Sequence, residues 1–218
     1  MGRLGILEGR GFCVVVNRAC RKPAGIAVAM TAALMLGGCA SVLGGGDKAI
    51  PTFDLTAPNG FTAPRAGSGQ MVISTPTALA VLDTEKIVVE PGPGQITYLD
   101  KAQWSDRLPA LFQARLIEAF ENGSRGRAVA RPGDRIVADY LLLTDIRAFS
   151  IQTFQGGPEA VVEISAKIVR DNAGRIVAAK VFTARVPSAG TSGAEATVAL
   201  DAASDKVFVD IVNWASRF

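Results

Sequence analysis

The sequence predicts an α+β fold, in which a mixed, largely antiparallel sheet carries two main amphipathic helices within a single domain. Three stretches rich in strand-forming residues, 140–149, 160–170 and 175–186, predict long consecutive strands. Apolar residues at helical spacing predict one helix shortly after Trp104 and another at about residues 194–215. Because most strands follow one another directly, this order favours an α+β layer over a wound βαβ sheet.

Residues 1–38 have the features of a lipoprotein signal peptide. The basic pair Arg21-Lys22 precedes an apolar run at 24–36, which is the order of a secretory signal. Leu36-Gly37-Gly38-Cys39 resembles a bacterial lipobox, so Cys39 is expected to become the first mature residue and to carry lipid. A transmembrane anchor with an incidental cysteine is the alternative, but the run is too short to span a bilayer.

Removal of residues 1–38 changes the balance of charge. The leader holds five of the 23 basic residues and one of the 20 acidic ones, so the net charge changes from +3 to about −1. No basic stripe remains to neutralise phosphates, which argues against nucleic acid as a partner. We expect a glycine-rich flexible tether at 39–50 and one α+β domain at 51–218.

The residues that remain offer little chemistry to an enzyme. Cys13 and Cys20 leave with the leader, and the chain contains no histidine, the usual general base and metal ligand. No Walker, dinucleotide or Gly-x-Ser-x-Gly motif is present. Glu118 and Glu121 have the spacing of a catalytic pair, but a solvated helix face is the favoured interpretation. The sequence therefore predicts no enzyme, no metal and no cofactor apart from lipid on Cys39.

Short strands open the mature chain. We expect a first strand at 52–55, a loop at 57–69 and a strand at 71–74. Strands at 87–89 and 96–99 are expected to form a hairpin around the Pro/Gly turn at 91–94.

The first helix is expected to start at Ser105 as N-cap, with Asp106 in its first turn and a stop at Asn122-Gly123. A further short strand is expected at 127–130. The apolar stripe of the helix consists of Leu108, Leu111, Phe112, Leu116, Ala119 and Phe120.

The second half of the chain has the clearest periodicity. Residues 162, 164, 166 and 168 are apolar and alternate with polar residues at 163, 165 and 167. Asp171-Asn172-Ala173-Gly174 predicts a tight turn with Gly174 in the left-handed region. The last helix should place its stripe on the sheet; this stripe consists of Ala196, Leu200, Ala203, Val207, Ile211 and Trp214.

Four aromatic or apolar residues are candidates for a partner contact. Tyr98 and Trp104 flank the entry to the first helix, where packing of the helix onto the sheet is the favoured interpretation. Ile151 and Phe154 lie at or near an expected hairpin tip beside Gly156-Gly157-Pro158. An apolar tip indicates a partner contact, but single exposed phenylalanines are common, and the sequence leaves both interpretations open.

The chain as a whole resembles the ABC-type transport auxiliary lipoprotein family, which includes the paraquat-inducible lipoprotein. The resemblance rests on the order of short motifs: the lipobox followed by Phe53-Asp54-Leu55; Ile73-Ser74-Thr75-Pro76 followed by Leu82-Asp83; Ile96-Thr97-Tyr98-Leu99 followed by Gln103-Trp104 and a helix; and paired strands around 171–174 with a final helix ending in Trp214. The chain departs from the family at Phe53, where tyrosine is frequent, and at Gln103, where arginine is usual.

The resemblance implies a partner protein and a cellular location. Such lipoproteins sit in the outer membrane, face the periplasm and associate with an MCE (mammalian cell entry) domain protein, and through it with an ATPase and a permease. Ala40 fits this location, because aspartate after the lipidated cysteine would resemble an inner-membrane retention signal. Two other functions stay open: a lipid carrier with an apolar groove, and a hydrolase using carboxylates. Homo-oligomerisation is plausible and also stays open, although no heptad repeat in the sequence supports it.

Overall fold

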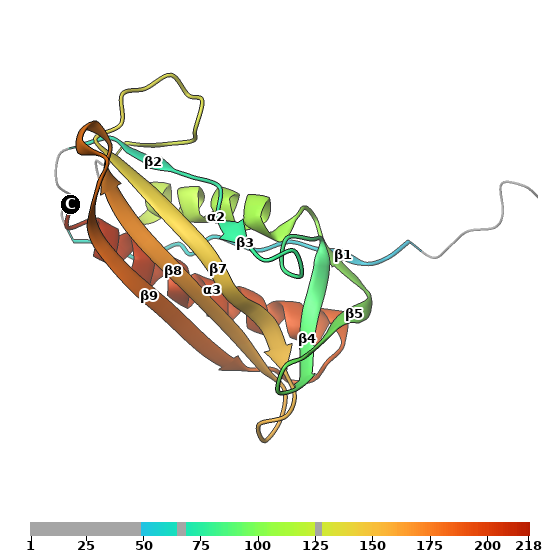
Figure 1. Ribbon diagram of the computed structural model, residues 1–218. Coiled ribbons are helices and arrows are strands. Elements are labelled where there is room, and N and C mark those ends of the chain that lie inside the picture. Colours follow the sequence, from blue (N-terminus) through green and yellow to red (C-terminus); the bar gives the residue numbers. More distant parts are fainter. Residues whose placement is uncertain (1–48, 65–68, 125–127) are drawn as a thin grey trace, which may run out of the picture. The chain divides into compact units, whose positions relative to one another are not determined.

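A mixed, open sheet forms the centre of the computed structural model, which describes residues 49–64, 69–124 and 128–218 (Figure 1). Within these residues, Ile50–Phe218 form a unit of their own. The strands are β1 (Thr52–Phe53), β2 (Met71–Ile73), β3 (Thr77–Ala78), β4 (Lys86–Gly92), β5 (Gln95–Trp104), β6 (Val129–Ala130), β7 (Tyr140–Gln152), β8 (Glu159–Arg170) and β9 (Arg175–Pro187). The helices are α2 (Leu108–Gly123), the short η2 (Asp171–Ala173) and α3 (Gly193–Ala215). The predicted α+β class is confirmed.

The three long strands form an antiparallel meander. β8 pairs with β7 from Glu159 to Arg170 and with β9 over the same residues. The chain turns between β8 and β9 through η2, and Gly174 has the left-handed φ of 57° that the sequence predicts. Glycine adopts this conformation without the steric cost that a Cβ atom brings.

The other edge of β7 is paired by three short segments in succession. β2, β3 and β4 each run parallel to β7, opposite its first, middle and last residues respectively. β4 then forms the predicted hairpin with β5, and β1 adds to β5 in parallel. β6 extends the sheet beyond β2. β9 is an edge strand, since β8 is its one partner in the described chain.

Both helices cover the same face of the sheet, which we call the covered face (Figure 1). The apolar row of β8 points to them and is fully buried, whereas the alternating polar row points to the helix-free face. The edge of the Trp104 ring meets Phe149, with ring centroids 5.9 Å apart. Phe112 of α2 meets Phe208 of α3 with centroids 4.8 Å apart, so aromatic rings join helix to helix and strand to strand.

The stripe of α3 lies on the sheet as predicted. Leu200, Val207 and Ile211 are at most 1% exposed, and the Trp214 ring meets Phe182 of β9 at 5.5 Å. The helix begins with a capping box, in which the Ser192 hydroxyl accepts from the Glu195 N–H and the Glu195 carboxylate accepts from the Ser192 N–H. The Ser192 hydroxyl also donates to Glu195 Oε2 (2.6 Å), and this hydrogen bond, followed by the one from the Ser192 N–H, holds the pKa of Glu195 below its usual value.

The expected start of the first helix is wrong. α2 begins at Leu108, not after Ser105, and its N-cap position is Arg107, which makes no side-chain cap hydrogen bond. Ser105 instead lies in a bend directly after β5, where its N–H donates to the carbonyl of Phe53 at the end of β1 (2.7 Å). Pro109 then lies in the first turn, where a missing N–H costs nothing.

Candidate partner-docking site

Two of the four candidate contact residues are buried in the core. Trp104 is 1% exposed and its ring packs against Phe149. Its side chain therefore packs in the core, as the favoured interpretation held, and does not contact a partner. Ile151 is 0% exposed and pairs with Ala160 inside the sheet. Ile151 lies near the hairpin tip as expected, because β7 ends at Gln152, but its buried side chain cannot contact a partner.

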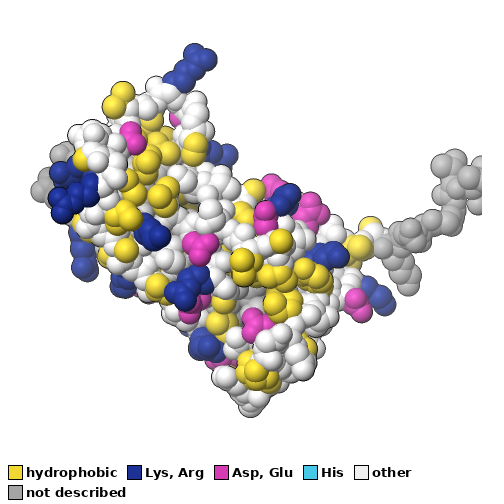
Figure 2. Space-filling view, in the orientation of Figure 1, with side chains coloured by type: hydrophobic (Ala, Val, Ile, Leu, Met, Phe, Trp, Pro, Cys, Tyr) yellow, Lys and Arg dark blue, Asp and Glu magenta, His cyan; other side chains and the backbone are white. Residues whose placement is uncertain are grey.

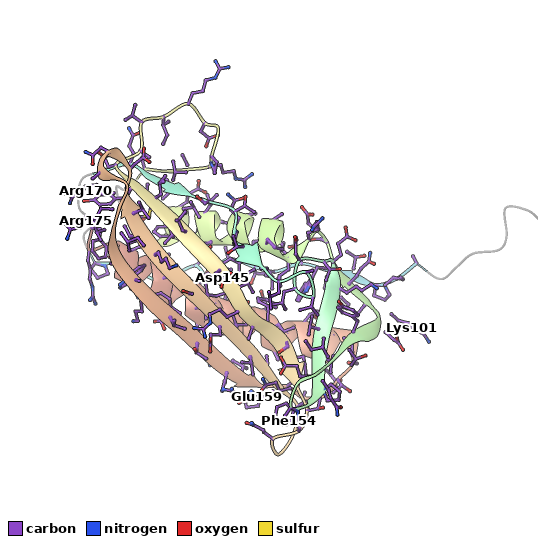
Figure 3. All side chains as sticks on the ribbon, viewed as in Figure 1. Lys101, Asp145, Phe154, Glu159, Arg170 and Arg175 are labelled. Carbon is purple, nitrogen blue, oxygen red and sulfur yellow. The ribbon has the colours of Figure 1, made fainter. Side chains whose placement is uncertain are left out.

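The other two candidates lie at the surface. Tyr98 of β5 is 37% exposed, and the Lys86 ammonium sits 4.9 Å from the centre of its ring. Phe154 is half-buried in the turn between β7 and β8, where Figure 3 labels it beside Glu159. Ile96, two residues before Tyr98 on β5, is 53% exposed, and the sequence analysis did not single it out.

The β4–β5 hairpin, which carries Ile96 and Tyr98 on β5, and the β7–β8 turn, which carries Phe154, lie at the same end of the sheet. β4 runs parallel to β7, with Glu90 opposite Gln152, so both strands end together. The N–H of Thr153 also donates to the carbonyl of Glu90 (3.1 Å). We name Ile96, Tyr98 and Phe154 the hairpin end. Apolar side chains that reach the surface from two hydrogen-bonded hairpins are suited to contact a partner.

Polar side chains fasten this end together. The Glu90 carboxylate accepts hydrogen bonds from Ser150 Oγ (2.6 Å) and Gln152 Nε2 (3.1 Å). Arg185 Nη1 donates to Gln152 Oε1 (3.2 Å) and to Glu159 Oε2 (2.8 Å). These carboxylates are therefore engaged in holding β4, β7, β8 and β9 in register.

A second surface feature lies between the edge strand β9 and α3. It is an apolar groove of about 410 Å³, and the helix side chain Val198 within it is 71% exposed. We name it the β9–α3 groove, and its main lining residues are Val186, Pro187, Ala194, Val198, Ala199 and Ala202.

The side chain of Asp205 lines the next hollow along α3, together with Ala184, Lys206 and Asp210. Its Oδ1 atom is buried and has no hydrogen-bond partner among the described residues. Burial, and then the nearby carboxylate of Asp201, raise the pKa of Asp205 to about 6. The sequence analysis missed this group, because a carboxylate on an amphipathic helix is normally solvated.

Glu118 and Glu121, the pair with catalytic spacing, line a surface hollow beside α2. Glu118 binds Arg115 (2.8 Å), and Arg115 also binds Asp54 (2.7 Å). Burial lowers the pKa of Arg115, but the hydrogen bonds to the two carboxylates outweigh it and raise the pKa overall. This arrangement ties α2 to the chain after β1.

Metal binding and membrane spanning can be judged for the residues that the structure describes. Among them, no three His, Cys, Asp or Glu side chains gather as a metal site, and no helix has the length and apolarity to cross a membrane. The predicted lipidation site Cys39, the signal peptide and the tether up to residue 48 lie outside the described residues.

Comparison with known proteins identifies the family. The model of the ABC-type transport auxiliary lipoprotein component family matches residues 53–212. The chain belongs to this family, as the order of its motifs indicated.

Individual relatives agree with this assignment. An uncharacterised protein of Bradyrhizobium diazoefficiens is 35% identical over 185 residues, which cover 83% of this chain and 49% of that protein. The chain thus spans about half the length of this curated relative. A crystal structure of a Xanthomonas campestris protein of the DUF330 family is 28% identical, with a TM-score of 0.64 over 76% of this chain and 92% of that one. Another crystal structure, of an uncharacterised protein, shares the fold at 13% identity, with a TM-score of 0.59 over 75% of this chain and 100% of that one.

Proposed function

We propose that this protein is a non-catalytic, lipid-anchored docking subunit of an ABC-type system that moves lipids between membranes, and that its direct partner is an MCE-domain protein. The observation that carries the proposal is the family match over residues 53–212, preceded by the lipobox-like stretch that ends at Cys39. The MCE-domain protein connects the lipoprotein to an inner-membrane permease and its ATPase.

In this proposal the anchor is covalent lipid on Cys39, and the domain faces the periplasm from the outer membrane. Two or more acyl chains hold a protein stably in a bilayer, because each buried methylene contributes about 0.8 kcal/mol. Ala40 supports the outer membrane as the location, since it differs from the aspartate of inner-membrane retention. Palmitate labelling of the wild type and its loss in Cys39→Ser test the anchor.

The hairpin end supports a docking role. Ile96 and Tyr98 are exposed and Phe154 is half-buried at one end of the sheet, and the neighbouring carboxylates are engaged in hydrogen bonds. We propose no catalytic residue and no cofactor. A small apolar contact of this kind suits a subunit that recognises another protein, because aromatic anchors contribute most of the energy at interfaces.

Co-purification tests the proposal. The full-length lipidated protein, expressed with its MCE-domain partner and extracted in mild detergent, is expected to retain that partner through size-exclusion chromatography. A Cys39→Ser variant with a cleavable export signal serves as control for binding that depends on the membrane alone. Recovery of only the monomeric lipoprotein, repeatedly and under crosslinking, would overturn the proposal.

A lipid carrier is the weaker alternative. A carrier needs an apolar space between sheet and helices, but Phe112, Phe149 and Phe208 fill that interface and are at most 1% exposed. The β9–α3 groove lies at the edge of the sheet, and Val198 within it is largely open to water. An acyl chain there would stay partly hydrated, which removes much of the benefit of burial.

A further inference from the structure

We propose that the β9 edge from Thr183 to Pro187, together with the β9–α3 groove, binds an extended segment of the transport partner. That segment adds to the sheet beside β9, places an apolar residue against Val198 and places a lysine or arginine beside Asp205. The inference rests on the proposed function, which supplies the partner, and it names the surface and the chemistry by which that partner is recognised.

The first observation is the free edge. β9 has 13 residues and pairs with β8 alone in the described part of the chain, so its outer edge presents unpaired backbone groups (Figure 1). Such edges are templates for an added strand unless charged side chains guard them. Lys180 guards the middle of β9, with its ammonium over the Phe182 ring at 4.7 Å. Arg185 is held by Glu159 and Gln152, which leaves this part of the edge accessible.

The second observation is an apolar row on α3 that the fold does not use. Ala194, Val198 and Ala202 follow one another at four-residue spacing and are exposed, while the neighbouring stripe through Leu200 is buried on the sheet. This exposed row and the end of β9 form the two walls of the groove. An extended segment lying along β9 would direct every second side chain into the groove.

The third observation is Asp205, which determines the charge of the ligand. Its buried Oδ1 has no hydrogen-bond partner in the described structure, whereas Asp201, one turn earlier, accepts from Thr56 N (2.7 Å) and Thr56 Oγ1 (2.8 Å). Lys206 and Arg185 line the same hollow, but neither donates to this buried oxygen. A buried carboxylate oxygen without a donor costs stability, and a basic side chain from the partner would supply the missing donor.

The spacing of these features restricts the ligand sequence. Val198 and Asp205 are seven residues apart, or about 10 Å along a helix. Residues two apart on a strand are about 7 Å apart, and residues four apart about 13 Å. A lysine or arginine two or four positions from the apolar residue would therefore reach Asp205. Ser188 N donates to Pro158 O (2.8 Å), so the groove adjoins the turn that carries Phe154.

Two other occupants fit less well. A second copy paired antiparallel about Arg185 would bring its own Ala184 and Val186 to the helix side, and neither can neutralise Asp205. A lipid acyl chain would occupy the groove but leave both Asp205 and the strand edge unpaired.

Site-specific photocrosslinking separates these occupants. The probe p-benzoylphenylalanine is placed at Val198 in the full-length lipidated protein, co-expressed with the MCE-domain partner, and at the exposed loop residue Val137 as control. The expected result is a crosslink from position 198, but not from 137, to a partner peptide that carries a lysine or arginine nearby. A crosslink from position 198 to a second copy of this chain, or to lipid alone, would overturn the inference.

Charge reversal gives an independent measurement. Asp205→Lys is expected to weaken binding of the purified, detergent-solubilised partner at least tenfold, while the matched Asp210→Lys changes it less than twofold. Thermal melts of each variant establish that it is folded. If the partner binds all variants equally and position 198 yields no crosslink, the inference is wrong and the proposed function stands. If the wild type fails to retain the partner, both are wrong.

Discussion

The two faces of strand β8 have different environments. On the covered face, Val162, Ile164, Ala166 and Ile168 are 0% exposed beneath the helices. On the helix-free face, charged and apolar side chains both reach the surface (Figure 2). Glu163 pairs there with Arg147 at 3.1 Å, and Leu143 and Val181 are 37% and 44% exposed. The comparison teaches that the covered face supplies most of the folding energy, whereas the helix-free face and the free edges are available for contact with partners.

Truncation of Trp104 should have the largest effect, because its side chain lies in the core. Trp104→Ala is expected to lower the free energy of unfolding by about 3–5 kcal/mol. Urea denaturation monitored by circular dichroism measures the loss. The matched variant Tyr98→Ala, also in β5 but at the surface, should lose less than about 1 kcal/mol. Equal losses would show that the two positions are not buried differently.

Gly123 tests how closely α2 is packed. A Cβ atom at this position would overlap the ring of Phe61, so Gly123→Ala is expected to destabilise the fold by about 1–3 kcal/mol. Thermal denaturation detects the change. In a Phe61→Ala background the same substitution should cost much less, and an unchanged cost would mean that the ring is not the obstacle.

Asp205 should make stability depend on pH. Its pKa is raised to about 6 in the folded state, where Asp201, Lys206 and Asp210 of α3 and Arg185 of β9 are its charged neighbours. The folded protein therefore holds a proton that the unfolded chain has lost between about pH 4 and pH 6, and stability falls as pH rises through this window. Asp205→Asn is expected to raise stability by about 1 kcal/mol at pH 7.5, after allowance for partial exposure, and by nothing near pH 4.

Chemical denaturation at the two pH values measures this difference, with Asp210→Asn on the same helix as control. A gain of equal size at both pH values would show that the amide improves packing or hydrogen bonding, and that titration is not the cause.

The hairpin end should show the smallest effect on folding. The double variant Tyr98→Ser, Phe154→Ser is expected to change the free energy of unfolding by less than about 1 kcal/mol. Under the proposed function, the same variant should weaken retention of the MCE-domain partner about tenfold or more, measured by co-purification at graded concentrations. Full retention would show that this end is not part of the docking surface.

The sequence predicted the regular parts of the fold and missed the parts set by distant residues. The alternation in β8 and the turn at Gly174 are confirmed, since each depends on neighbours in the chain. β3 was not predicted, because Thr77-Ala78 has no strand pattern of its own and this strand exists through its pairing with Asp145 and Ile146. The capping box at Ser192 and Glu195 was missed although its Ser-x-x-Glu spacing is visible in the sequence.

The candidate contact residues divide in the same way. In the sequence, an apolar residue before a Gly-Gly-Pro turn looks the same whether its side chain points into the core or out to solvent. Ile151 and Phe154 are three residues apart, yet one is buried against the covered face and the other lies in the turn. Register decides between them, and register is set by pairing with β4 and β8.

The sequence by itself determined the α+β class, the two amphipathic helices, the long meander and the family. The tertiary structure decided where α2 begins, which candidates are buried, and that a buried carboxylate oxygen of Asp205 without a hydrogen-bond partner lies in the hollow between α3 and β9. Periodicity and turn chemistry act between residues close in the chain, so they can be read from it. Strand pairing and burial depend on groups far apart in sequence, such as the Phe53 carbonyl that accepts from the Ser105 N–H, and only folding brings these together.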